Sequence, residues 1–182
     1  VAFDAKIEDI KYLRASIRER DTGFMDDWVA IALDTYGDNR SLILIGSNAY
    51  GSQIDFKETL GAHDSDISYN VNYETKAVIG EDGYIVEMAI PFSELQYEKK
   101  DTLRWKASFL RTSWKESKIA VSNNKFDRGN DCISCQIDTY IELEGVNPKK
   151  RLEFLPYVSG NYVGSSDGNK ISYDKPNFKA GL

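Results

Sequence analysis

The sequence predicts an all-β protein, built as an antiparallel β-sandwich of the jelly-roll or Greek-key type. Three observations predict this class. Apolar and polar residues alternate in short runs, which places one side of each pleated strand in a core. Clusters of turn-forming residues separate the runs. No window sustains a helical apolar stripe, and the helix-strand alternation of a parallel nucleotide-binding sheet is missing.

The alternating runs predict the individual strands. We expect strands at residues 12–18, 28–34, 42–47, 75–79, 84–90, 105–111 and 137–143. Residues 36–40 and 80–83 are rich in Gly, Asp and Asn, so each predicts a hairpin turn. Val86 and Met88 should then face the core. Pro91 should end its strand, because proline cannot donate to the ladder.

The organisation of the chain changes near residue 148. A chain of 182 residues can supply one full core and an appendage. We expect a β-sandwich over residues 1–148, with its N-terminal part missing because the chain opens without Met inside a strand pattern. Residues 149–182 are expected to form a linker and the start of a C-terminal β region. Alternatively, they complete an edge of the first sheet.

Charge and composition narrow the class of function. The chain carries 29 acidic and 23 basic residues, a net charge of -6 that repels a phosphate backbone unless the basic groups are segregated. The sequence has no basic stripe, so nucleic acid is not an expected partner. No stretch approaches the roughly 18–20 consecutive apolar residues of a spanning helix.

Two cysteines, Cys132 and Cys135, form a Cys-x-x-Cys motif. Such a motif can be a redox pair or half of a metal site. It can also be a pair of ordinary loop cysteines or, in an exported protein, a local disulfide. A redox motif normally opens a helix of a βαβ unit, whereas the residues after Cys135 alternate like a strand. We therefore favour a structural role.

An ordered set of short motifs covers residues 1–157. The motifs are Arg20-Asp21, residues 26–29, Asn48-x-x-Gly51-x-Gln53-x-Asp55, residues 82–92, and residues 151–153 before Pro156-Tyr157. In this order they resemble the family 9 carbohydrate-binding-module-like (DOMON-like) domain at the N-terminus of a family of Bacteroidota outer-membrane β-barrel proteins. The resemblance implies a cell-envelope location, at the outer membrane, in the periplasm or at the cell surface. It also implies that residues 149–182 lead into an outer-membrane β-barrel of the same chain.

The resemblance further implies a polysaccharide or oligosaccharide ligand. Sugar binding needs flat aromatic faces together with polar groups for the hydroxyls. The candidate carbohydrate-binding residues are Tyr50, Tyr69, Tyr73, Trp114 and Arg111. Tyr69 and Tyr73 stand where the family usually carries tryptophans. Trp28 and Trp105 are expected to lie in the core instead, because large aromatic side chains fill sandwich interiors.

Acidic residues gather in two loops and suggest structural calcium, which prefers six to eight oxygen ligands. The candidate metal ligands are Asp21, Asp26, Asp27, Asp64 and Asp66. The resemblance also favours calcium, since modules of this fold often carry it. The alternative is that these are turn carboxylates, with Asp27 capping the backbone or pairing with Arg18 or Arg20.

We do not expect an enzyme. The only histidine, His63, lies in a polar loop, and no nucleophile elbow accompanies it. A glycan hydrolase would need paired carboxylates across a cleft, and no pair is singled out. The expected function is a non-catalytic glycan-binding module of an outer-membrane-associated protein. The alternative is a protein-interaction or plug-like docking domain for the barrel or for other envelope proteins, without sugar binding.

Overall fold

The computed structural model describes residues 1–60, 65–114, 117–127, 129–146, 156–166, 168 and 170–181. Its strands are β1 (Ala2–Lys6), β2 (Trp28–Asp34), β3 (Ser41–Asn48), β4 (Gln53–Thr59), β5 (Glu74–Ile79), β6 (Gly83–Ala89), β7 (Thr102–Trp114), β8 (Lys118–Ser122), β9 (Tyr140–Glu144), β10 (Tyr157–Asn161), β11 (Gly164–Ser166), β12 (Ile171–Tyr173) and β13 (Asn177–Gly181). The short 3-10 helices are η1 (Ile10–Tyr12), η2 (Gly23–Met25), η3 (Phe92–Glu94) and η4 (Ser134–Gln136). The chain divides into two compact units, Val1–Lys149 and Lys150–Leu182.

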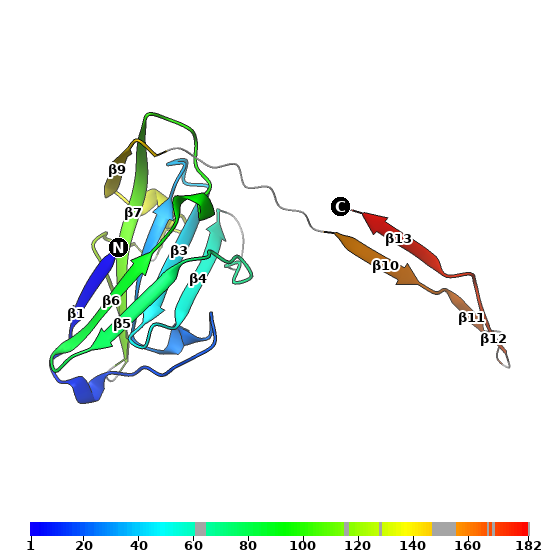
Figure 1. The fold of residues 1–182 in the computed structure, drawn as a ribbon, viewed down its shortest axis with the longest axis horizontal. Coiled ribbons are helices and arrows are strands. Elements are labelled where there is room, and N and C mark those ends of the chain that lie inside the picture. The colour runs from blue at the N-terminus through cyan, green and yellow to red at the C-terminus, as the bar shows by residue number, and fades with distance from the viewer. Residues whose placement is uncertain are drawn as a thin grey trace. The chain divides into compact units, whose positions relative to one another are not determined.

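Unit 1 contains two antiparallel sheets that lie face to face (Figure 1). The smaller sheet has the strand order β1-β6-β5. The larger has the order β4-β3-β2-β7-β8, and β9 pairs with the first part of β7 while β8 pairs with its last part. This arrangement confirms the predicted all-β, antiparallel sandwich. No helix in the described part of the chain is long and apolar enough to cross a membrane.

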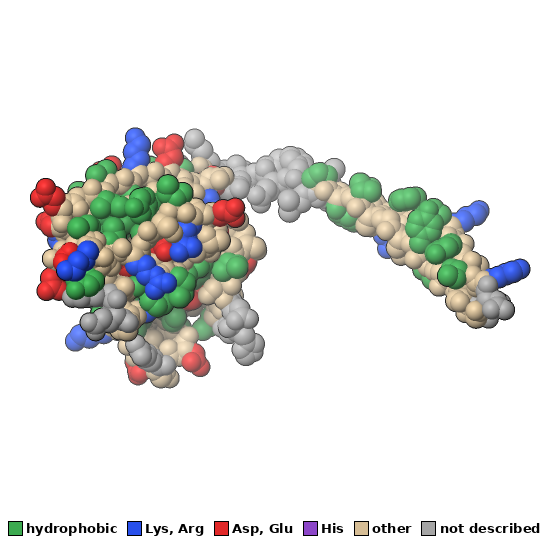
Figure 2. Space-filling model, turned by 90° about the horizontal axis from the view of Figure 1, so that it is seen from below, with side chains coloured by type: hydrophobic (Ala, Val, Ile, Leu, Met, Phe, Trp, Pro, Cys, Tyr) green, Lys and Arg blue, Asp and Glu red, His purple; other side chains and the backbone are tan. Residues whose placement is uncertain are grey.

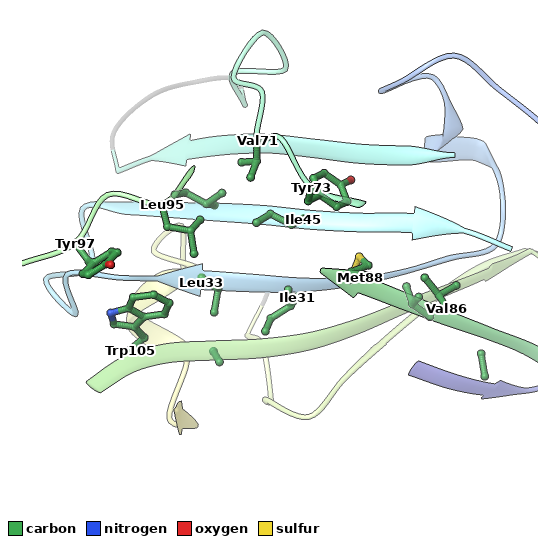
Figure 3. Close-up of a cluster of buried hydrophobic side chains, with 14 of the residues drawn as sticks. Ile31, Leu33, Ile45, Val71, Tyr73, Val86, Met88, Leu95, Tyr97 and Trp105 are labelled. Carbon is green, nitrogen blue, oxygen red and sulfur yellow. The ribbon is translucent and has the colours of Figure 1, made fainter. Parts of the chain in front are cut away.

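The main core lies between the two sheets (Figure 3). It takes odd-numbered residues from β2, β3 and β7, which point toward the smaller sheet, and residues of β6 that point back. Val86 and Met88 are buried there, as the sequence predicted. Trp105 is 3% exposed, and its ring packs against Tyr97, with a centroid distance of 5.2 Å. The remaining buried space is filled from the connecting segments, for example by Val71 and Leu95.

Most predicted strands occur where they were expected. The strand predicted at 28–34 coincides with β2, and the turns at 36–40 and 80–83 join β2 to β3 and β5 to β6 as antiparallel hairpins. The strand predicted at 137–143 starts only at Tyr140, because η4 occupies the residues before Ile137. The pattern missed β4 and β8.

The strand predicted at residues 12–18 is wrong. This segment leaves η1 as extended chain that pairs with side chains instead of with a neighbouring strand. The N–H groups of Arg14, Ser16 and Arg18 donate to Asp27 Oδ2, Asp26 Oδ2 and Ser52 Oγ. Alternation in this segment therefore reflects an extended backbone whose partners are capping side chains.

Unit 2 consists of two antiparallel pairings, β10 with β13 and β11 with β12. The expected boundary at residue 148 lies outside the described residues. Side chains alternate across this hairpin, with Val158 and Phe178 on one face and Ser159 and Lys179 on the other. The Phe178 ring covers Gly160, where a Cβ atom would lie only 2.9 Å from the ring. Figure 2 shows hydrophobic side chains along the length of this unit.

Candidate functional site

The outer face of the larger sheet, which faces away from β1-β6-β5, carries a second apolar layer. Every residue of β2 is buried, and so are seven of the eight residues of β3. Even-numbered residues of these strands form two small clusters, one around Trp28 and Leu44 and one around Ala32 and Leu42. A sheet with one wet face would carry polar residues at these positions. The central strands are therefore apolar on both sides.

A groove of about 990 Å³ opens on this outer face. Its floor consists of Trp28, Ala32, Leu42, Leu44, Ser108 and Leu110. Ala32 and Ser108 are directly paired across β2 and β7, and both small side chains are buried, with Ile137 packed against Ala32. Four residue steps along β2 give the floor a length of about 13 Å, and the three neighbouring strands β3, β2 and β7 give it a width of about 10 Å. This volume lies in the range of small-molecule sites.

Two walls rise beside the floor. The first wall comes from β4 and the residues after it, and it consists of Phe56, Glu58, Thr59, Leu60 and Ser65. The second comes from the connection between β8 and β9, and it includes Phe126, Asp127, Asn130, Asp131, Ile133 and Gln136. Arg40 and Ser41, from the turn between β2 and β3, also line the groove. An apolar floor thus lies between walls that carry charged, amide and hydroxyl groups.

The second wall is fixed by its own hydrogen bonds. The Gln136 amide nitrogen donates to the carbonyl oxygens of Asp127, Asn130 and Cys132, at 3.2–3.3 Å. Ser134 Oγ donates to the Asn39 carbonyl oxygen at 2.8 Å, which ties the wall to the turn between β2 and β3. A wall held in this way needs little ordering when a ligand binds, and this favours affinity.

Cys132 and Cys135 form a disulfide in this wall, with their Cα atoms 5.3 Å apart. The disulfide lies at η4, and the chain after η4 continues into β9. The motif therefore does not open an α-helix of a βαβ unit, as a redox motif normally does. It is therefore the local disulfide that was one of the alternatives left open by the sequence. Its place suggests a structural role in holding the second wall.

We expect removal of this disulfide to loosen the wall selectively. Cys132→Ser/Cys135→Ser should cost about 2 kcal/mol or less, the loop-closure entropy of a very short ring. Amide hydrogen exchange should accelerate at residues 129–137, whereas β2 and β3 should keep their protection. Treatment of the wild-type protein with a thiol reductant is the matched measurement and should give the same pattern. Equal exchange in oxidised and reduced protein would contradict the structural role.

None of the five predicted carbohydrate-binding residues lines this groove. Tyr73 is 6% exposed, and its hydroxyl donates to the Gly46 carbonyl oxygen at 2.6 Å and accepts from Ile54 N–H at 3.0 Å. It is a core residue, so its ring offers no free face to a sugar. Tyr69 is half-buried, with Lys57 Nζ 5.5 Å from its ring centroid.

The other three candidates are dispersed over unit 1. Tyr50 is exposed in the turn between β3 and β4. Trp114, at the end of β7, is half-buried beneath Arg14, whose guanidinium carbon lies 5.0 Å from the ring centroid. Arg111 lines a separate hollow of about 240 Å³ next to β1 and β8. The structure does not bring the five residues together as one site.

The predicted metal ligands Asp26 and Asp27 are each 1% exposed and bind protein N–H groups. Asp26 Oδ2 accepts from Arg18 Nε at 2.8 Å, Asn48 Nδ2 at 2.9 Å and Ser16 N–H at 3.2 Å. Asp27 accepts from the N–H groups of Trp114 and Arg14. The two carboxylates thus cap the extended segment before β2. This is the alternative that the sequence left open for Asp27.

The remaining metal candidates serve other contacts or lie outside the described residues. Asp21 Oδ1 accepts from Asp55 N–H at 2.7 Å, and Asp66 Oδ1 accepts from Ser68 N–H at 3.0 Å. Asp64 lies outside the described residues. Within the described ranges, no three His, Cys, Asp or Glu side chains form a group that could hold a metal ion. The geometry described thus gives no support to these residues as a calcium site.

The environment of Asp26 gives a pH-dependent contribution to stability. Burial raises the pKa of its carboxyl, but the hydrogen bonds from Arg18, Asn48 and Ser16 outweigh burial and hold the pKa below its usual value of 3.8. Because the folded pKa is depressed, the stabilisation is present above about pH 4 and is lost as the pH falls through the folded pKa.

We therefore expect Asp26→Asn to cost about 1–3 kcal/mol at neutral pH, since it removes the charge that pairs with Arg18 and buries an amide NH2 group in place of Oδ1. The difference between wild type and variant should shrink as the pH falls below about 4. Urea unfolding across this pH range measures it. Asp55, whose pKa burial raises, is common to both proteins and cancels in the comparison. Burial also raises the pKa of Asp27, and the Asp26 charge adds a smaller upward effect that the variant removes. A difference that stays constant with pH would contradict the assignment.

The groove residues were missed in the sequence, although a signal for them exists. Ala32, Leu42 and Leu44 occupy the positions of β2 and β3 that alternation assigns to solvent, and all are apolar. Trp28, which was expected in the sandwich interior, is buried in the cluster on the outer face instead. Comparison with protein-family models, with curated proteins and with solved structures gives no significant match.

Proposed function

We propose that this chain is a non-catalytic glycan-binding module whose ligand occupies the groove on the outer face of the larger sheet. The observation that carries the proposal is the groove itself, with its apolar floor and polar walls on a rigid two-layer scaffold. Ligand sites commonly combine an apolar concavity with a few polar groups that fix orientation.

The two walls offer the groups that a sugar needs. Phe56 and Phe126 are half-buried aromatic side chains in opposite walls, and each can pack against the apolar face of a pyranose. Glu58 and Asp131 supply carboxylate acceptors for hydroxyl groups, and Asn130 supplies an amide. The floor is longer and wider than one pyranose ring, so we propose an oligosaccharide segment as the ligand.

We propose a cell-envelope location for the protein, with unit 2 leading into an outer-membrane barrel. Two features of unit 2 support it. One face of the β10–β13 pairing carries Val158, Phe178 and Ala180, the other carries Ser159 and Lys179 together with Tyr157, and large hydrophobic side chains such as Tyr162, Ile171 and Tyr173 are at least 64% exposed. Alternation of this kind is the pattern of strands that place one face in lipid. Cell fractionation tests this location: recovery of the native protein in the outer-membrane fraction is expected, and recovery in the cytoplasmic fraction would contradict it.

A second candidate function is docking to an envelope protein. Strand β8 favours it, because it lies at an edge of the larger sheet and exposes Ile119 and Val121, each 53% accessible. An edge strand with exposed β-branched residues can pair with a further strand. Docking through β8 would leave the groove free, so Val121→Lys should abolish partner capture and preserve glycan binding.

Isothermal titration of the purified chain with plant and bacterial oligosaccharides tests the glycan proposal. We expect saturable heat, with dissociation constants in the millimolar range or tighter for at least one glycan. The same titrations with added calcium and with a chelator test whether calcium contributes. If no oligosaccharide of the panel gives binding heat at millimolar concentration, the result would contradict glycan binding and favour the docking function.

A further inference from the structure

The charged side chains that line the groove indicate which kind of glycan it binds, an inference that rests on the proposed function. Among the described residues, three carboxylates line it: Glu58 in the first wall, and Asp127 and Asp131 in the second. Among the described residues that line the groove, Arg40 is the only one with a basic side chain. The described part of the lining therefore has an excess of negative charge, like the whole chain.

Arg40 does little to offset these carboxylates. It belongs to the turn between β2 and β3, and its side chain is 83% exposed. Its Nε atom lies 3.8 Å from Oδ2 of Asp38, a carboxylate of the same turn. Its charge is thus shared with a local partner and screened by water.

The carboxylates are placed where a ligand would meet them from both sides. Glu58 is half-buried on β4, and its Oε1 lies 3.3 Å from Ser65 Oγ, which donates to it. Asp127 Oδ1 accepts from Gly129 N–H at 2.8 Å, which holds its side chain at the second wall. Asp131 is exposed in the same wall. A glycan on the floor would therefore lie between negative charges.

We propose that Glu58, Asp127 and Asp131 are specificity-determining residues that make the groove select uncharged glycans and reject those that carry carboxylate or sulfate groups. A carboxylate accepts hydrogen bonds from neutral sugar hydroxyls. An anionic sugar brings like charges together beside these carboxylates, and the repulsion is strongest at low ionic strength because Asp127 and Asp131 are exposed. The three acidic residues thus stabilise a bound neutral sugar through its hydroxyl groups and repel a sugar that carries a negative charge.

A matched pair of ligands tests this selectivity. Each neutral oligosaccharide that binds is compared with the same oligosaccharide oxidised at C6 to the uronate, which changes the charge and keeps the length and linkage. We expect the oxidised form to bind at least 10-fold more weakly at low ionic strength. The difference in affinity between the neutral and the oxidised glycan should become smaller as salt is added, because salt screens exposed charges.

Charge-neutralising variants assign the effect to the three residues. Glu58→Gln/Asp127→Asn/Asp131→Asn should raise the affinity for the oxidised glycan and close most of the gap. The control is Glu74→Gln/Asp101→Asn/Glu144→Gln, which changes the net charge equally at exposed positions outside the groove lining and should leave the gap intact. Equal narrowing by both variants would assign the effect to net charge and overturn the role of the groove residues.

The outcomes separate this inference from the function on which it rests. Equal binding of neutral and oxidised glycans overturns the selectivity and leaves glycan binding in place. Tighter binding of the oxidised form overturns it as well. Absence of binding by every glycan overturns both.

Discussion

Replacing Trp105 with alanine is expected to destabilise unit 1 by about 3–5 kcal/mol, the usual cost of truncating a buried large aromatic side chain. Trp105 is 3% exposed and lies on the core side of β7. Its ring contacts Tyr97 and Phe92, with centroid distances of 5.2 and 5.8 Å. Loss of the ring would leave a cavity between the two sheets that the paired strands cannot close.

Urea unfolding followed by tryptophan fluorescence and circular dichroism measures this loss. The matched control is Tyr36→Ala, which removes an aromatic side chain that is 48% exposed in the turn between β2 and β3. We expect the control to stay within about 0.5 kcal/mol of wild type. A Trp105→Ala protein that unfolds at the wild-type urea concentration would mean that the two sheets do not pack as described.

Removing both aromatic side chains from the groove walls is expected to produce the largest loss of glycan affinity. Phe56 and Phe126 belong to different walls, and they pack against different small clusters of the outer face. An aromatic contact of this type is worth about 1 kcal/mol beyond the area that it buries, so each alanine variant should lose about 10-fold in affinity. Because the free-energy effects of substitutions at separated sites add, the double variant should lose about 100-fold in affinity.

The control for this experiment is Tyr50→Ala. Tyr50 is 52% exposed and does not line the groove, although the sequence proposed it as a sugar-binding residue. Its replacement should leave glycan affinity unchanged. Thermal unfolding of each variant shows whether the fold persists at the titration temperature. Loss of affinity in Tyr50→Ala, with binding retained in Phe56→Ala/Phe126→Ala, would place the site outside the groove.

The sequence predicts the sandwich well where two paired strands are neighbours in the chain and are joined by a short turn. Strand β2 and the hairpin after it follow from alternation and from the Gly-Asp-Asn turn at residues 37–39. Alternation fails at residues 12–18, because an extended segment capped by Asp26 and Asp27 has the same pattern as a strand. An alternating pattern indicates that the backbone is extended and which side chains share a face. It does not identify the groups to which the backbone N–H and C=O groups bind.

The groove depends on contacts that alternation cannot supply. Its floor requires Ala32 and Ser108 to meet across β2 and β7, which are far apart in the chain. Its second wall requires the connection between β8 and β9 to fold over the outer face, where Gln136 binds three carbonyl oxygens. The available signal was the apolar character of Leu42 and Leu44 at positions expected to face water, which indicates that something covers this face.

The predicted aromatic candidates illustrate the same difficulty. Tyr73 and Trp114 are aromatic residues near polar loops, and the sequence does not reveal that Tyr73 fills the core. Its hydroxyl is bound by backbone groups of β3 and β4, and burial raises its pKa above the ordinary value. A tyrosine of this kind is structural. Exposure, which is set by the tertiary fold, separates it from Phe56 and Phe126.

Mapping the binding surface by NMR tests the central claim most directly. Backbone amide shifts of the isotope-labelled chain are followed during titration with the neutral oligosaccharide that gives the strongest heat. If the groove is the site, the largest shifts will fall on Ala32, Leu42, Leu44 and residues 126–137, and residues near Tyr50 and Trp114 will stay unchanged. Shifts confined to Tyr50 and Trp114, or no shift at saturating glycan, would contradict it.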